Sequence, residues 1–143
     1  MKFVSIDHNN IEDLKKFIAN IGRSIKSFRY YINREMSNVI NNHITTLLLW
    51  ENEYIGYGHL DKEEDKVWLG ICIKEGSEGK GYGKIIMQKL VDSYDGDIHL
   101  SVDKDNAKAF RLYEQFLFKK IQENDSTFFM KRVGLNEKIY TSN

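Results

Sequence analysis

The sequence predicts an α/β fold: a mixed sheet, antiparallel through its first half and parallel only around a glycine-rich loop, with helices on both faces. Two observations predict it. Residues 44–73 hold three extended segments separated by short polar turns, which is typical of strands joined by hairpins. The glycine-rich loop that follows leads into residues with helical periodicity. In 143 residues no long polar spacer occurs, so we expect one domain over residues 1–133 and a polar tail over 134–143.

In the first half of the chain, the spacing of apolar residues predicts each helix and strand. A helix is expected where isoleucines and a leucine recur every three or four residues before Gly22, and the aromatic and basic stretch after it is helical or irregular. The third hairpin strand lacks polar alternation, so we expect it to be buried on both faces. The expected elements are a strand at 3–6, a helix at 11–21, the irregular stretch at 27–39, and strands at 44–50, 54–61 and 67–73.

The second half alternates helices and strands. A helix begins in the glycine loop and ends near Asp95, and a second helix carries an apolar stripe and is expected to be capped by Asp103 or Asp105. The expected elements are helices at 82–94 and 106–117, a strand at 98–102, and a final hairpin of 118–123 and 127–133. The tail is expected to be a loose end or a dimer contact.

Composition excludes several classes of partner. Lys plus Arg equals Asp plus Glu at 21 each, so no overall field attracts nucleic acid or an anionic membrane. The single cysteine, Cys72, cannot form an internal disulfide or a cysteine-rich zinc site, and we expect no metal. The amino terminus does not read as a signal peptide and no apolar run could span a bilayer, so we expect a cytoplasmic protein, monomeric or homodimeric.

Three alternate glycines, Gly79, Gly81 and Gly83, stand between a strand and a helix. Glycines let the backbone turn tightly, and the free amides at a helix start bind phosphate with help from the helix dipole. Lys80 and Lys84 add positive charge there. Such a loop can also be an ordinary strand-to-helix connection, but its spacing fits neither a Walker loop nor a dinucleotide fold.

This loop resembles the acetyl-CoA loop of the GNAT superfamily, which has the pattern Gln/Arg-x-x-Gly-x-Gly/Ala directly after the fourth strand. Gly81 and Gly83 match the pattern, whereas Glu78 stands where the family carries Gln or Arg. Backbone amides would still carry most of the pyrophosphate contact.

A second segment resembles the GNAT pattern Asn-x-x-Ala-x-x-x-Tyr-x-x-x-Gly-Phe. Asn106, Ala109, Tyr113 and Phe118 are in register, and Leu117 replaces the glycine. Two motifs in the right order are much more specific than either alone, and the resemblance covers nearly the whole chain.

The resemblance implies a GNAT fold with a splayed central strand pair and acetyl-CoA as acyl donor, its pantetheine arm lying along the backbone of the strand before the loop. Asn106 would hydrogen-bond the pantetheine or a nearby loop. The implied coenzyme-binding residues are Ile71, Cys72, Ile73, Glu78, Gly79, Lys80, Gly81, Tyr82, Gly83, Lys84, Asn106 and Phe110.

Tyr113 is the expected general acid. It lies two helical turns after Asn106, so both side chains can face one cleft, and the resemblance implies that it protonates the departing CoA thiolate. Core packing on the aromatic stripe is the alternative. Cys72 is expected to be a small buried hydrophobe rather than a nucleophile, because direct attack by the amine needs no acyl-enzyme.

The general base is expected to be His59, which shares one strand face with Tyr57 and Asp61 and has a reference pKa near neutrality. A histidine on a strand is more often structural, and Asp61, Glu75 and His43 are the other candidates.

Aromatic residues around one cation form the candidate acceptor site. Stacking and anion binding together suit a ring-bearing amine, with Arg29 holding a phosphate or carboxylate. The alternative is a helix that packs its aromatics on the sheet and leaves Arg29 in solvent. The residues are Phe28, Arg29, Tyr30 and Tyr31, with Trp68 on the central strand.

We therefore expect an N-acetyltransferase that moves an acetyl group to a primary amine of a small molecule by direct attack in a ternary complex, with a nucleotide-linked amino sugar as the narrower hypothesis. Acetylation of a protein amino terminus or lysine is the alternative within the same chemistry. A module that binds acyl-CoA without catalysis is the alternative of another class.

Overall fold

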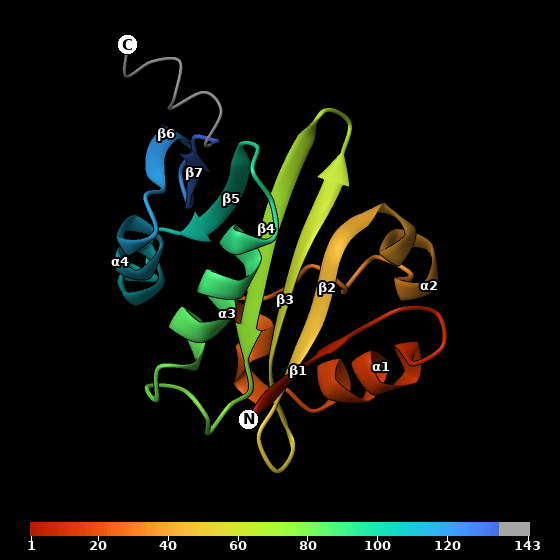
Figure 1. Cartoon of the computed structure of the whole chain (residues 1–143). Helices are drawn as coiled ribbons and strands as arrows, with labels where there is room; N and C mark the ends of the chain where they lie inside the picture. Colours follow the sequence, from red (N-terminus) through yellow and green to blue (C-terminus); the bar gives the residue numbers. More distant parts are fainter. Residues whose placement is uncertain (135–143) are drawn as a thin grey trace.

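The computed structural model describes residues 1–134, so the expectation for the tail concerns residues that, Gly134 apart, lie outside the described part. Seven strands form one sheet in the order β1-β2-β3-β4-β5-β7-β6 (Figure 1). Every neighbouring pair is antiparallel except β4 and β5. The strands are β1 (Lys2–Ser5), β2 (His43–Trp50), β3 (Tyr54–Glu63), β4 (Lys66–Ile73), β5 (Ile98–Asp103), β6 (Lys119–Glu123) and β7 (Thr127–Arg132). The predicted mixed α/β sheet is confirmed.

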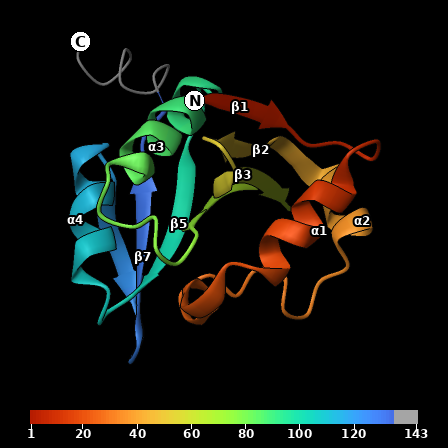
Figure 2. The ribbon, with the colours of Figure 1, turned by 90° about the horizontal axis from the view of Figure 1, so that it is seen from below.

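Helices cover both faces of the sheet, as predicted (Figures 1 and 2). One core cluster lies beneath α3 and α4 and the other beneath α1, α2 and the segment between them. The helices are α1 (Ile11–Ala19), α2 (Met36–Val39), α3 (Tyr82–Asp92) and α4 (Ala107–Gln115), with 3₁₀ turns η1 (Gly22–Lys26) and η2 (Ile40–Asn42).

The segment expected to be helical or irregular, 27–39, contains only the four-residue helix α2 and is otherwise built of turns. Its aromatic residues Phe28 and Tyr31 are nevertheless buried, because they pack on the sheet beside Tyr57. This segment therefore covers part of one sheet face without regular backbone hydrogen bonding.

The parallel pair β4 and β5 separates soon after it forms. Pairing is confined to Val67 with Ile98 and Trp68 with His99, although β4 continues to Ile73 and β5 to Asp103. The two halves of the sheet diverge beyond this point, leaving one backbone edge of β4 open.

Two local expectations were wrong. The cap of α4 is Asn106, whose Oδ1 accepts a hydrogen bond from the amide of Ala109 at 3.2 Å, rather than Asp103 or Asp105. The strand β4 is not buried on both faces: Gly70 and Ile71 are half-exposed because the strand borders the opening beside β5.

None of the helices in residues 1–134 is long and apolar enough to cross a membrane.

Candidate active site

A cavity of about 790 Å³ lies where β4 and β5 separate. Its walls come from the end of β4, the glycine loop, the first turn of α3, one side of α4 and the η1 turn. Of the residues predicted for the site, twelve line it: Phe28, Ile71, Cys72, Ile73, Glu78, Gly79, Gly81, Tyr82, Gly83, Lys84, Asn106 and Tyr113. Residues from both motifs thus meet at one cavity.

The glycine loop presents backbone to this cavity. Gly79 and Gly81 have φ of +75° and +86°, a left-handed conformation that side chains with a Cβ rarely adopt. Gly81 is the N-cap of α3, and no side chain of the described residues caps this helix. A Cβ added at Gly81 would meet nothing within 4 Å. The amides of the first turn therefore have no side-chain acceptor among the described residues, and the helix dipole favours an anion beside them.

Cations surround the same opening. Lys84 comes from α3, Lys108 and Arg111 from α4, and Arg23 from η1, and all four line the cavity. Glu78, which departs from the family pattern, lies 3.2 Å from the hydroxyl of Ser24. The charge balance at this mouth is positive, so phosphate groups would be attracted to it.

The middle of the cavity offers the open edge of β4 and the phenol of Tyr113. Burial raises the pKa of Tyr113, so its hydroxyl keeps its proton and can donate it. Burial also raises the pKa of the Cys72 thiol to about 12, which disfavours the thiolate needed for nucleophilic attack. Asn106 uses its side-chain oxygen to cap α4, so its amide nitrogen remains as a donor.

His59 does not line the cavity. It is 2% exposed and lies behind Phe28, with 6.1 Å between the two ring centroids. Burial, with the nearby charges of His43 and Arg34, holds the pKa of His59 well below its ordinary value. The imidazole is therefore neutral at physiological pH.

The three other candidate bases are differently placed. Glu75 accepts hydrogen bonds from the backbone amide and the Nε of Arg23, both at 2.6 Å, and the amide bond lowers its pKa most. Burial lowers the pKa of His43 to about 4. Asp61 accepts a hydrogen bond from the hydroxyl of Tyr30 on one oxygen, and its buried Oδ1 has no hydrogen-bond partner among the described residues but lies 3.9 Å from Nε2 of His43.

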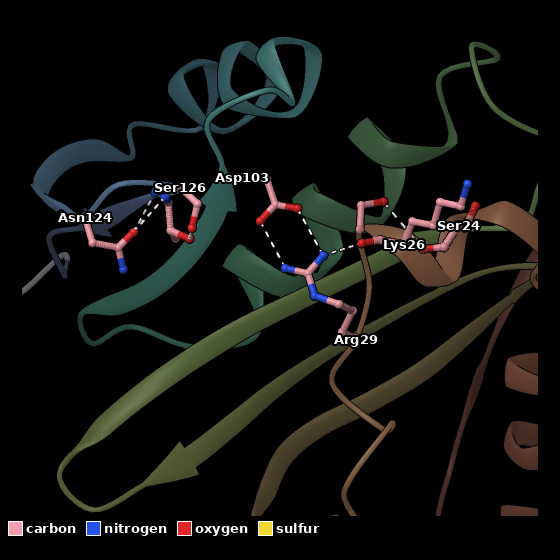
Figure 3. Close-up of polar contacts among 8 residues, drawn as sticks. Ser24, Lys26, Arg29, Asp103, Asn124 and Ser126 are labelled. Atoms are coloured by element: carbon pink, nitrogen blue, oxygen red, sulfur yellow. Dashed lines mark hydrogen bonds and ion pairs between the residues drawn. The ribbon is translucent and has the colours of Figure 1, made fainter.

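The residues predicted to bind the acceptor are dispersed. Phe28 lines the cavity, whereas Tyr30 contacts His43 and Asp61, and Trp68 lies against His99 with ring centroids 5.5 Å apart. Arg29 points to Asp103 at the end of β5 and donates to both carboxylate oxygens, at 3.1 and 3.2 Å (Figure 3). The guanidinium also donates to the carbonyl of Lys26. Arg29 is therefore paired with a carboxylate.

Two other predicted residues lie outside the lining. Lys80 is exposed in the glycine loop, and Phe110 packs against Phe128 with ring centroids 5.2 Å apart.

Sequence reasoning missed several lining residues. Lys108, Arg111 and Gln115 could have been found, because their spacing of three and four places them on one side of α4. Arg23 and Ser24 had no comparable signal, because they reach the cavity through the irregular η1 turn.

Comparisons with known proteins agree with this geometry. The model of the acetyltransferase (GNAT) family matches residues 10–118. No curated protein matches the chain. Among solved structures, the PaiA N-acetyltransferase of Thermoplasma acidophilum in complex with coenzyme A has a TM-score of 0.72 at 19% identity, over 93% of this chain and 99% of that one.

Two further structures have the same fold. The spermidine N-acetyltransferase of Vibrio cholerae, in complex with CoA and spermine, has a TM-score of 0.72 at 16% identity, over 93% and 95% of the two chains. The ribosomal-protein-S18-alanine N-acetyltransferase of Escherichia coli has a TM-score of 0.69 at 14% identity, over 92% of each chain.

Proposed function

We propose that this chain, which belongs to the acetyltransferase (GNAT) family, is an N-acetyltransferase that transfers the acetyl group of acetyl-CoA to a primary amine of a small molecule. The observation that carries the proposal is a juxtaposition. The uncapped start of α3, where Gly79 and Gly81 lie, opens into the same cavity as the edge of β4 that no strand of residues 1–134 pairs beyond Trp68; on this edge the carbonyl of Ile73 accepts a hydrogen bond from the hydroxyl of Ser24 at 2.6 Å. A long coenzyme with a diphosphate at one end and an amide-bearing arm at the other matches both features.

The residues have separate roles along this cavity. Amides at the start of α3 would bind the diphosphate, while Lys84, Lys108 and Arg111 neutralise its charge. The backbone of Ile71–Ile73 would pair with the pantetheine amides as a strand does, and would polarise the thioester carbonyl. Tyr113 would donate its proton to the CoA thiolate as it departs.

A small acceptor is supported by the closure around the cavity. Phe28 lines the cavity, and the next residue, Arg29, is ion-paired with Asp103 at the end of β5. An extended polypeptide that passed between these two segments would have to displace the ion pair. A nucleotide-linked amino sugar is the narrower hypothesis. It requires Arg29 to exchange Asp103 for a phosphate.

The experiment follows release of CoA thiol from acetyl-CoA with a panel of amines. The panel contains amino sugars, nucleotide-linked amino sugars, polyamines and amino-terminal and lysine peptides. We expect release with small amines and not with peptides, and affinity for CoA by calorimetry without any amine. Affinity without release across the panel would instead favour a binding module.

Substitution of Tyr113 by Phe tests the acid role. We expect Tyr113→Phe to lose about 100-fold in kcat, while the Kd for CoA changes little. Tyr94→Phe is the matched control, since Tyr94 is a partly buried core tyrosine outside the cavity lining, and it should keep the rate. Full activity in Tyr113→Phe would show that another group or water protonates the thiolate.

A further inference from the structure

The side chain of His59 is held through one of its two ring nitrogens. Nδ1 lies 2.7 Å from the hydroxyl of Tyr57, and that hydroxyl is hydrogen-bonded in turn to the hydroxyl of Tyr31. All three side chains are buried. This chain of hydrogen bonds occupies Nδ1, so Nε2 is the nitrogen that remains to receive a proton from a ligand.

Nε2 is directed over Gly70, the residue of β4 that pairs with His59. A Cβ at Gly70 would lie 2.4 Å from Nε2 and 2.6 Å from Cε1, so any side chain at this position would occupy the space of the ring. Gly70 is two residues past the last pair that β4 forms with β5, and its neighbour Ile71 lines the cavity. The absent side chain thus lets a buried imidazole reach the splayed strand.

We propose that Tyr57 is a positioning residue for acetyl transfer: its hydroxyl accepts the Nδ1–H of His59 and so directs the lone pair of Nε2 across Gly70 toward the acceptor amine. This inference rests on the proposed function. Gly70 is the second positioning residue, because its missing side chain leaves the space that the His59 ring occupies against β4.

The proton balance is simple. The acceptor ammonium carries three protons and the amide product keeps one. One proton reaches Nε2 of His59 by way of a water, because the ring lies outside the cavity lining, and then passes to solvent, which frees the amine to attack the thioester carbonyl carbon. The C–S bond breaks, the thiolate takes the proton of Tyr113, and the last ammonium proton restores that phenol through solvent.

A hydroxyl suits this position because it both donates and accepts. Tyr57 can accept from Nδ1–H whether the imidazole is neutral or protonated, while donating to Tyr31 throughout. No heavy atom then has to move when His59 takes the proton. The titratable and charged groups around the ring are Tyr57 and Asp61 of β3, His43 of β2, Cys72 of β4, and Tyr30, Tyr31 and Arg34 of the connecting segment.

The first test reads the tautomer in the wild-type protein, without any reaction. Long-range ¹H–¹⁵N spectra of the histidine rings at pH 7 should show His59 protonated on Nδ1, with its signals assigned by their loss in His59→Gln. In Tyr57→Phe the Nε2–H form should gain population, because that tautomer predominates in free imidazole side chains. A wild-type ring protonated on Nε2 would overturn the inference.

The second test is kinetic. We expect Tyr57→Phe to lower kcat about 10-fold or more with an unchanged KM for acetyl-CoA, and to move the acid limb of kcat/KM to lower pH, because the imidazolium loses an acceptor. Gly70→Ala should lower kcat while CoA affinity is kept. The control is Tyr54→Phe on the same strand, whose hydroxyl lies 3.4 Å from Asp13 and apart from this cluster; it should match wild type.

The outcomes separate the two proposals. An active wild type with unchanged rates and pH limbs in both His59→Gln and Tyr57→Phe would overturn this inference alone. Absence of transfer to any amine in the wild type would overturn the proposed function and this inference with it. A loss of kcat in Tyr57→Phe with an unmoved pH limb and an unchanged tautomer would reduce Tyr57 to a structural role, which also contradicts the inference.

Discussion

Arg29 and Asp103 form a two-point ion pair between segments that lie 74 residues apart in the chain. Asp103 ends β5 and Arg29 follows η1, so the pair connects the two sides of the opening beside β4 (Figure 3). Both side chains keep contact with solvent, at 55% and 26% exposure, so the pair is weak and can exchange partners.

That exchange gives the first prediction. Asp103→Asn removes the carboxylate and leaves Arg29 available for an anionic group on the acceptor. If the acceptor carries a phosphate, its KM should fall several-fold in Asp103→Asn, whereas the KM of an amino sugar without a phosphate should not change. The free energy of unfolding should drop by less than about 1 kcal/mol in urea titrations. A KM that stays constant for both acceptors would remove Arg29 from the acceptor site.

The glycine loop gives a matched pair of variants. Gly81 and Gly76 both have positive φ, +86° and +93°, and an added Cβ meets nothing within 4 Å at either, but only Gly81 lines the cavity. Alanine at either position should cost about 1–2 kcal/mol of backbone strain. Only Gly81→Ala should also weaken CoA binding, by about 10-fold, the equivalent of one charge-assisted hydrogen bond. Calorimetry that finds equal affinities in the two variants would contradict anion binding at this helix start.

Leu117 occupies the place of the motif glycine and has the backbone conformation that a glycine would adopt. Its φ is +70° and its side chain is 55% exposed, so the strain is not offset by burial. We expect Leu117→Gly to raise the free energy of unfolding by up to about 1 kcal/mol, by relieving the left-handed strain. Leu117→Ala keeps the Cβ and should gain little, and equal stability of the two variants would show that the strain is negligible.

The lowered pKa of His43 should make the free energy of unfolding depend on pH. Its folded-state pKa of about 4 lies below the ordinary 6.5, so between these values the unfolded chain binds a proton that the folded protein does not. The free energy of unfolding should therefore fall as the pH drops from 6.5 toward 4, by up to about 3 kcal/mol from this group. In His43→Gln the same urea titrations should give a shallower slope. An equal slope would assign the pH dependence to other groups.

The parts of the fold that sequence could predict are those with strong periodicity. The strands near 44–50 and 54–61 and the helix from Tyr82 repeat their apolar residues clearly enough to be located within a few residues. The structure of segment 27–39 could not be predicted from sequence, because its turns have no periodic pattern and its aromatic residues are buried by packing on the sheet. The cap of α4 could not be chosen from sequence, because Asp103, Asp105 and Asn106 are all of cap-forming types and lie within four residues; the backbone geometry at Asn106 decides the choice.

Some residues of the candidate site could likewise be predicted from sequence, and others could not. The resemblance to the two GNAT motifs implies one ligand site for Gly81, Asn106 and Tyr113, and in the structure all three line one cavity. The alternation of β3 put His59 and Tyr57 on one face, yet their burial depends on the turns that follow η1 and could not be read from the strand. Ion pairs such as Arg29 with Asp103 depend on how distant segments pack, which no local pattern encodes.

Within residues 1–134 only two residue pairs join β4 to β5, so the two halves of the sheet are held together mainly by the shared core beneath α3 and α4. A ligand laid along the open edge would act as a missing strand, sharing backbone hydrogen bonds that the polypeptide itself cannot supply. Binding of the donor molecule would then raise the thermal stability of the fold and complete the catalytic site, and both effects would be lost when the donor dissociates.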